Sequence, residues 1–254
     1  MWWLILLISL VILAIMIIVV LRTYFSCYQL EPFEQVVDRT KFRPDEYKSG
    51  DLVLFRWNSD KPRSYGSEVL VNELRGAIPT HIGLLLRKNG KLYCAEATIW
   101  DWAKGKVSDI YNPERASGTK LCDFEEMVKI YPGQIFIRKL NKPLTDQQQD
   151  LLERLTKDHR DEVFDMSIRN ASGGVTAIGM YDLGMKKLGK WWRSKVRKEG
   201  IYCSEYIARL LQNLGILSKD RANWSYAPYM LTKKSPHNAQ LINGYRYGDE
   251  IQIT

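Results

Sequence analysis

The longest apolar run of the chain lies at its start, where Trp2–Leu21 is apolar except for Ser9. At about 1.5 Å per residue, a helix of this length spans roughly 30 Å, the thickness of the hydrocarbon core of a bilayer. No basic residue precedes the run and no A-x-A sequence follows it, unlike a cleaved signal peptide. A buried core helix would not be apolar on every face. The pattern therefore predicts a retained single-pass anchor over residues 1–22.

The charges that flank this run bear on its orientation. Arg22, Arg39 and Lys41 follow it. Positive residues favour the cytoplasmic side of a membrane, so we expect the C-terminal part there. The sequons at Asn170 and Asn223 would be glycosylated if the domain instead faced a secretory lumen, so both sides remain open.

Beyond the anchor the hydrophobic pattern changes twice. Residues 23–48 mix charged, proline and aromatic residues without a period, which predicts a juxtamembrane tether. Residues 49–254 are long enough for one domain with a sizeable core. Strand patterns occupy 50–57, 81–98 and 134–140, and helical patterns occupy 67–74, 145–158 and 203–214. Strands clustered early with helices elsewhere predict an α+β domain, an antiparallel sheet packed on helices.

The segment from His81 to Thr98 predicts a hairpin that pairs a histidine with a carboxylate. Asn89-Gly90 between apolar runs is typical of a two-residue type I′ turn, which fixes the register and places Gly83 opposite Glu96. His81 and Glu96 then become diagonal neighbours on one face, with Gly83 leaving space between them. A carboxylate beside an imidazole fixes its tautomer and stabilises the imidazolium. The alternative is two surface residues that happen to share a strand pair.

The sequence around the other two histidines gives less reason to expect a role in proton transfer. His159 lies in the charged run KDHRDE, where we expect it to be solvated, and His237 lies in the loop KKSPHNAQ. The hairpin histidine is therefore the candidate for proton transfer.

Cys203 precedes one apolar helical face formed by Ile207, Leu210, Leu211 and Leu214. It therefore falls at a helix N-terminus, where backbone N–H groups and the helix dipole stabilise a thiolate and can hold an oxyanion. We predict Cys203 as the nucleophile, His81 as the general base and Glu96 as the group that orients the base. The alternative is a buried structural cysteine.

The remaining cysteines predict no further chemistry. Cys94 and Cys122 belong to no C-x-x-C pair, so a zinc knuckle or a redox pair is disfavoured, and no disulfide framework is indicated. Cys94 is expected in the core. Cys27 lies just past the anchor, where it would be either acylated or an unmodified thiol. No metal or cofactor is expected.

The chain is basic, with 37 Lys and Arg against 29 Asp and Glu. No zinc finger, glycine-rich phosphate loop or aromatic RNA motif accompanies this charge, so no nucleic acid partner is expected. The basic run Lys186–Lys198 contains two tryptophans and is typical of an interfacial segment on anionic lipid. The alternative is an ordinary amphipathic helix packed on the core.

The motifs GDLVLF (50–55), THIG (80–83), AEA (95–97) and YCSE (202–205) bring His, Glu and Cys in that order. They resemble the circularly permuted NlpC/P60 papain-like superfamily, in particular the YiiX/YaeF-type group with its poxvirus relatives. Phe164 and Asp165 resemble a Tyr/Phe-Asp element of that group. The resemblance implies a papain-like fold and thiol-dependent attack on an acyl bond by Cys203, with His81 as base and Glu96 as orienter. Because the group has poxvirus relatives, the resemblance also adds a viral membrane to the expected locations.

The substrate stays open between three hypotheses. Non-permuted relatives cut cell-wall peptides, whereas permuted ones often act on lipid esters and amides. We favour a membrane-anchored thiol hydrolase or acyltransferase for an amide, ester or thioester of a lipid. The alternatives are a peptidase of the same mechanism and a catalytically silent, membrane-tethered binding or structural protein. A long segment at 101–133 departs from the group and is expected to shape the substrate pocket.

Overall fold

The computed structural model describes residues 38–56, 81–98, 107–114, 117–131, 133–159, 184–196, 200–233 and 239–254, with Trp3, Val11, Ala14 and Glu162. Its strands are β1 (Leu52–Arg56), β2 (His81–Lys88), β3 (Lys91–Thr98), β4 (Gly118–Asp123), β5 (Gln134–Leu140) and β6 (Tyr247–Gln252). Its helices are α3 (Phe124–Ile130), α4 (Asp146–Asp158), α6 (Lys186–Val196) and α7 (Cys203–Asn213). Short 3₁₀ turns are η1 (Arg39–Lys41), η2 (Pro44–Glu46), η3 (Asn223–Ser225) and η4 (Pro228–Leu231).

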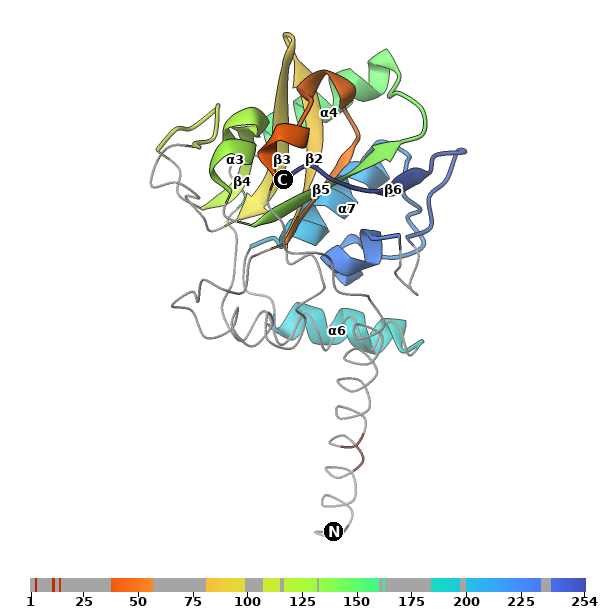
Figure 1. Ribbon diagram of the computed structural model, residues 1–254. Coiled ribbons are helices and arrows are strands. Elements are labelled where there is room, and N and C mark those ends of the chain that lie inside the picture. Colours follow the sequence, from red (N-terminus) through yellow and green to blue (C-terminus); the bar gives the residue numbers. More distant parts are fainter. Residues whose placement is uncertain are drawn as a thin grey trace.

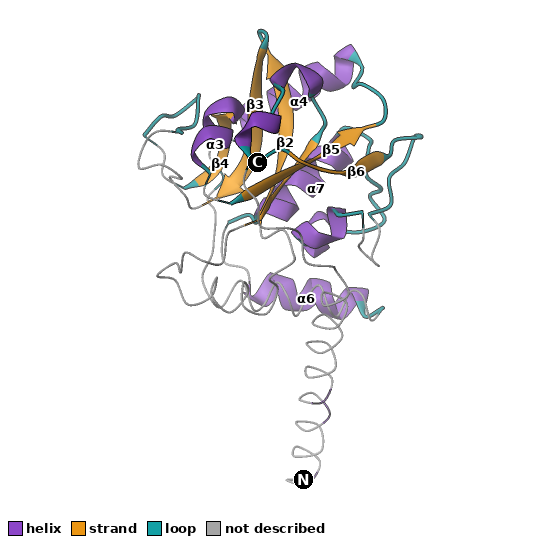
Figure 2. Cartoon of the chain, viewed as in Figure 1, coloured by secondary structure: helices purple, strands orange, loops and turns teal. Residues whose placement is uncertain are grey.

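The strands form one six-stranded sheet in the order β4-β3-β2-β1-β5-β6. Every neighbouring pair is antiparallel. In Figure 1, α7 crosses behind the strands and α3 lies beside β4; Figure 2 shows the same division between strands and helices. This confirms the expected α+β architecture of an antiparallel sheet with helices.

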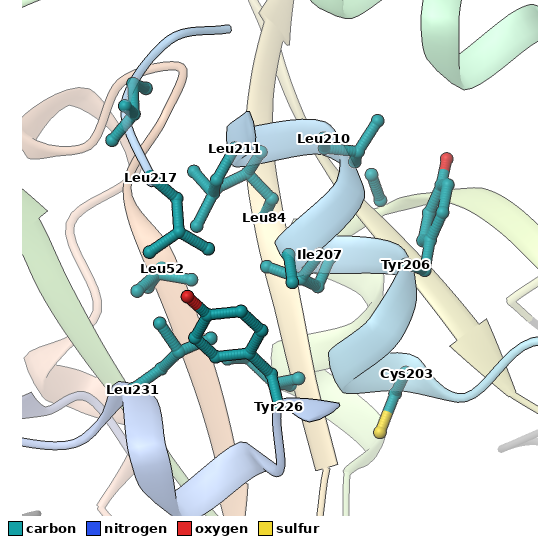
Figure 3. Packing of buried hydrophobic residues seen from close by; sticks show 14 of the residues in the cluster. Leu52, Leu84, Cys203, Tyr206, Ile207, Leu210, Leu211, Leu217, Tyr226 and Leu231 are labelled. Atoms are coloured by element: carbon teal, nitrogen blue, oxygen red, sulfur yellow. The ribbon is translucent and has the colours of Figure 1, made fainter. Parts of the chain in front are cut away.

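Both faces of the sheet are buried, because successive strand residues point to opposite sides. Leu52 and Leu54 pack on the α7 side, whereas Val53 and Phe55 pack on the α3 side. On the α7 side, Ile207 and Leu211 meet the strand leucines, as Figure 3 shows. Burying each such side chain stabilises the fold by about 1.5–3 kcal/mol.

Local signals in the sequence predicted several details correctly. Gly83 pairs with Glu96 and Lys88 with Lys91, the predicted hairpin register. Asn89 and Gly90 have φ values of 50° and 79°, as a type I′ turn requires. Helix α4 begins with a complete capping box between Thr145 and Gln148.

The end of helix α7 also follows its sequence signal. Gly215 has a φ of 68°, its N–H donates to the Gln212 carbonyl at 3.2 Å, and the Ile216 N–H donates to the Leu211 carbonyl at 2.9 Å. These two bonds form a Schellman motif, which satisfies the last carbonyls of the helix.

Two strands were not predicted. β4 lies inside the 101–133 segment and pairs with β3, and β6 lies in the C-terminal tail and pairs with β5. β4 (GTKLCD) and β6 (YGDEIQ) carry few apolar residues and so show no clear alternation of polarity. They are recognised as strands only by their pairing with β3 and β5, and this pairing depends on residues far away in the sequence.

The described end of the predicted tether, residues 38–48, packs on the domain. The Arg39 side chain donates to the carbonyls of Val128 and Tyr131 at 3.0 and 2.8 Å. The Phe42 ring packs edge-on against Phe124, and Tyr47 is buried. These contacts join the segment to α3, so the folded unit extends upstream of residue 49.

Several predictions fall outside the described residues. They are the anchor Trp2–Leu21 apart from Trp3, Val11 and Ala14, the helix at 67–74, and the residues Cys27, Phe164, Asp165, Asn170 and His237. Within the part of the chain that is described, no helix has the length and apolar character needed to cross a bilayer. The anchor therefore stays a prediction.

Candidate active site

Cys203 is the first residue of α7, as the helical pattern predicted. The N-cap residue, Tyr202, makes no side-chain capping hydrogen bond to the helix. The Tyr202 side chain therefore does not occupy the backbone N–H groups of the first turn, which lie beside the Cys203 thiol. In Figure 3 the Cys203 sulfur points away from the apolar side chains that the rest of α7 buries. The Ser204 hydroxyl donates to the Tyr226 carbonyl at 2.8 Å and holds this end of the helix in place.

His81 and Glu96 meet as the hairpin register predicted. The Nε2 atom of His81 lies 2.6 Å from the Oε2 atom of Glu96. Glu96 is 0% exposed and His81 is 8% exposed, so the bond is shielded from water and only the imidazole reaches the surface. The Phe55 ring, 5.2 Å from the imidazole between centroids, covers it on the α3 side. The carboxylate therefore fixes the orientation of the ring.

The other neighbour of His81 is Cys203. Cys203 lies close enough to act on the imidazole through both its charge and hydrogen bonding. Because Nε2 is held by Glu96, Nδ1 is the ring nitrogen that remains for the sulfur. Burial lowers the pKa of His81, but the charge and hydrogen bond of Cys203, together with those of Glu96, raise it from 6.5 to about 10. The imidazole is therefore a cation at neutral pH.

This contact joins residues that belong to opposite faces of the sheet. His81 and Glu96 share the parity of Phe55 and Cys94, which pack on the α3 side, whereas α7 packs on the other side. His81 is the first residue of β2, so its ring lies at the end of the sheet. There it reaches the N-terminus of α7.

We expect His81 to stay protonated at about pH 8 and to titrate near pH 10, far above a free imidazole. A Cys203→Ala variant lacks the side chain that raises the pKa of His81, so the midpoint should fall by about one to three pH units. Long-range ¹H–¹⁵N spectra of histidine-labelled protein measure both values. A wild-type midpoint near 6.5 would contradict the ion pair.

Two residues of β4, which the sequence analysis missed, surround the carboxylate. The Cys122 thiol donates to the Oε1 atom of Glu96 at 3.9 Å. Lys120 is buried and stands directly opposite Glu96 in the β3–β4 register. The segment at 101–133 therefore contributes to the site by supporting Glu96; no signal in the sequence indicated this, since β4 itself was not recognised.

The space beside Gly83 is occupied, which corrects the expectation that this glycine leaves it open between His81 and Glu96. A Cβ atom at Gly83 would lie 2.3 Å from the Cys94 sulfur and 3.2 Å from the Ala95 carbonyl oxygen. Cys94 itself is fully buried, as predicted, and burial raises the pKa of its thiol well above the usual value. Gly83 is therefore needed because the Cys94 side chain fills its position.

A Gly83→Ala variant should be destabilised by about 1–3 kcal/mol, the range for overpacking a core. The double variant Gly83→Ala/Cys94→Ala should recover most of this loss, because the sulfur in the way has been removed. Urea unfolding followed by circular dichroism measures both. Equal stability of Gly83→Ala and wild type would mean that the Cys94 side chain moves aside freely, contrary to this account.

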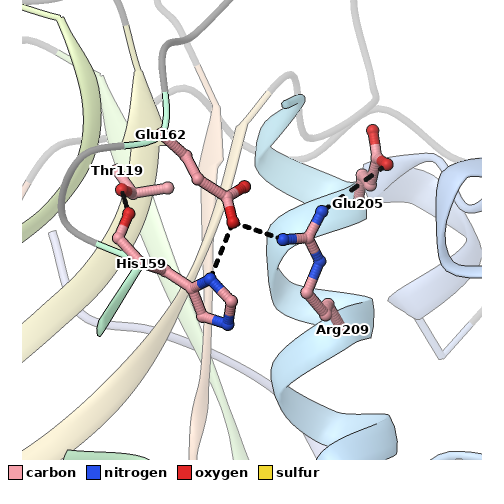
Figure 4. Close-up of polar contacts among 5 residues, drawn as sticks. All are labelled: Thr119, His159, Glu162, Glu205 and Arg209. Atoms are coloured by element: carbon pink, nitrogen blue, oxygen red, sulfur yellow. Dashed lines mark hydrogen bonds and ion pairs between the residues drawn. The ribbon is translucent and has the colours of Figure 1, made fainter. Parts of the chain in front are cut away.

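His159 is half-buried and paired with a carboxylate, whereas the sequence predicted a solvated side chain. Its Nδ1 atom lies 2.7 Å from the Oε1 atom of Glu162, which Arg209 of α7 also binds at 2.5 Å. Figure 4 shows Arg209 between Glu162 and Glu205, and Thr119 of β4 donating to the His159 carbonyl. His159 is the C-cap residue of α4, and its pairing with Glu162 leaves it half-buried despite its charged sequence context. This network holds α4, β4 and α7 together.

The described residues contain no group of three or more His, Cys, Asp or Glu side chains placed to hold a metal ion. His81, Glu96 and Cys203 bring an imidazole, a carboxylate and a thiol together in one place. These are the components needed for covalent acyl transfer through a thiol.

No protein-family model matches the chain, and no curated protein matches it. Among solved structures, the chain is similar to the metalloprotein yiiX from Escherichia coli O157:H7, with 13% identity and a TM-score of 0.44. The match covers 81% of this chain and 98% of that one. It is of the YiiX/YaeF type that the sequence motifs resemble. A TM-score below 0.5 does not establish a shared fold, so membership of the permuted NlpC/P60 group stays a prediction.

Proposed function

We propose that this chain is a membrane-anchored thiol hydrolase or acyltransferase that acts on an amide, ester or thioester. The observation that carries the proposal is the contact between Cys203, at the start of α7, and an imidazole that Glu96 holds at 2.6 Å. A thiol at a helix N-terminus beside an imidazolium is an activated nucleophile.

Acylation would begin with attack of the Cys203 thiolate on the carbonyl carbon of the substrate. A C–S bond forms and the carbonyl π electrons move to oxygen, where the first N–H groups of α7 stabilise the negative charge. When the carbonyl re-forms, the bond to the leaving group breaks, and the His81 imidazolium gives its proton to that group. The products are an acyl-thioester on Cys203 and a neutral imidazole.

Deacylation would use the same groups in reverse. Neutral His81 takes a proton from water, or from an acceptor alcohol or amine, as that nucleophile attacks the thioester carbonyl. The C–S bond breaks and the thiolate returns beside the imidazolium. Glu96 stays ionised throughout and stabilises the positive charge on His81.

A lipid acyl group is our preferred substrate, because both the predicted anchor over 1–22 and the basic helix α6 suit a chain that works beside a membrane. Full-length protein in nanodiscs would be incubated with parallel panels of acyl lipids and of peptides. The expected result is lipid turnover, with an acyl adduct on Cys203 seen by mass spectrometry after rapid quenching. Cleavage confined to the peptides would favour the peptidase. Absence of any adduct and any turnover on both panels would favour a silent binding protein.

A further inference from the structure

Helix α6 lies apart from the sheet, below the strands in the views of Figures 1 and 2. It precedes Cys203 by few residues, since Val196 and Cys203 are 203 − 196 = 7 positions apart. At no more than about 3.6 Å per residue, that distance is at most about 25 Å. The C-terminal end of α6 is therefore held within about 25 Å of the first residue of α7.

The surface of α6 is unusual because it exposes large apolar side chains. Leu188 is 43% exposed and Trp191 is 53% exposed. The two are three positions apart and so share one side of the helix. The adjoining side of the helix is less exposed, with Gly189 buried and Trp192 half-buried. An exposed tryptophan beside an exposed leucine is more typical of a docking surface than of a solvated helix.

The charges on α6 have one sign. Its sequence, KKLGKWWRSKV, contains no acidic residue. Lys187, Lys190 and Lys195 are exposed around the apolar pair. Each lysine can extend its charged end along the helix while its methylene chain covers apolar surface. Apolar residues surrounded by cations complement the acyl boundary and the anionic headgroups of a bilayer.

We propose that α6 is an interfacial helix that binds the surface of an anionic lipid bilayer. Leu188 and Trp191 enter the headgroup region while Lys187, Lys190 and Lys195 pair with lipid phosphates or carboxylates. This contact brings the start of α7 to the membrane surface, where a lipid acyl group can reach Cys203. The last step rests on the proposed function, whereas the lipid contact itself does not.

The test uses the full chain with Cys203→Ala, so that lipid contact is measured without catalysis. A photoreactive benzoylphenylalanine replaces Trp191 in one protein and Ile251 in the other. Ile251 is a matched control because it is 41% exposed but lies on β6. Both proteins are reconstituted in nanodiscs of phosphatidylcholine alone or of an equal mixture with phosphatidylserine, and crosslinked lipid is measured by mass spectrometry.

The expected result is lipid crosslinking from position 191, stronger in the anionic nanodiscs and much weaker from position 251. Replacing Lys187, Lys190 and Lys195 with glutamine should reduce the anionic preference, by about fivefold for each lysine. Unchanged circular dichroism of that variant would exclude unfolding. Equal crosslinking from both positions, insensitivity to phosphatidylserine, or crosslinking to protein or nucleic acid in place of lipid would overturn the proposal. Because catalysis is absent, these outcomes are independent of whether the chain is an acyl-transfer enzyme.

Discussion

Replacing Cys203 with alanine is expected to reduce acyl transfer by about 10⁴-fold or more, because the covalent route is lost with its nucleophile. No other described thiol can take its place, since Cys94 and Cys122 are buried in the sheet and burial raises the pKa of each well above its usual value. The initial rate on the substrate found by the lipid and peptide panels measures the effect. Cys94→Ala is the matched control, which should change the rate little.

The same assay distinguishes the two paired histidines. His81→Ala removes the proton donor and acceptor and should slow acyl transfer by about 10²- to 10⁴-fold. His159→Ala also removes an imidazole bonded to a glutamate at similar distance, but that pair lies in the network around Arg209 rather than at Cys203. It should leave the rate nearly unchanged. Equal losses in the two variants, or a Cys203→Ala protein that keeps its rate, would contradict the proposed catalytic group.

Replacing Glu96 with alanine is expected to lower the free energy of unfolding by about 3–5 kcal/mol, the range for breaking a buried charge pair from one side. Glu96 is completely buried, its carboxylate bonds His81 at 2.6 Å, and the buried Lys120 stands opposite it. Without the carboxylate, the buried His81 imidazolium loses the charged partner that it bonds. Chemical denaturation followed by circular dichroism measures the change.

A surface glutamate supplies the control for this variant. Glu126 pairs with Lys129 at 2.6 Å, but both side chains are exposed, so Glu126→Ala should change stability by at most about 1 kcal/mol. A loss at Glu96 no larger than at Glu126 would mean that the carboxylate is not the counter-charge of the site.

Short-range rules were sufficient for the elements that form the site. The Asn89-Gly90 turn determined the hairpin register, and the register placed Glu96 diagonally from His81. The spacing of apolar residues after Cys203 determined where α7 begins. These features depend on backbone sterics and on periods of two and 3.6 residues, so they can be predicted from a few neighbouring residues.

The rest was decided only by the tertiary structure. The pairing of β4 with β3 brings Lys120 and Cys122 to Glu96, and the turn after α4 brings His159 to Glu162. Above all, the sequence could nominate His81 and Cys203 but could not place them together, because strand parity assigns His81 to the face that α7 does not cover. They meet because β2 begins at His81, at the end of the sheet that the first turn of α7 reaches. Such a contact depends on how a helix is positioned over a sheet, which long-range packing determines and no local pattern encodes.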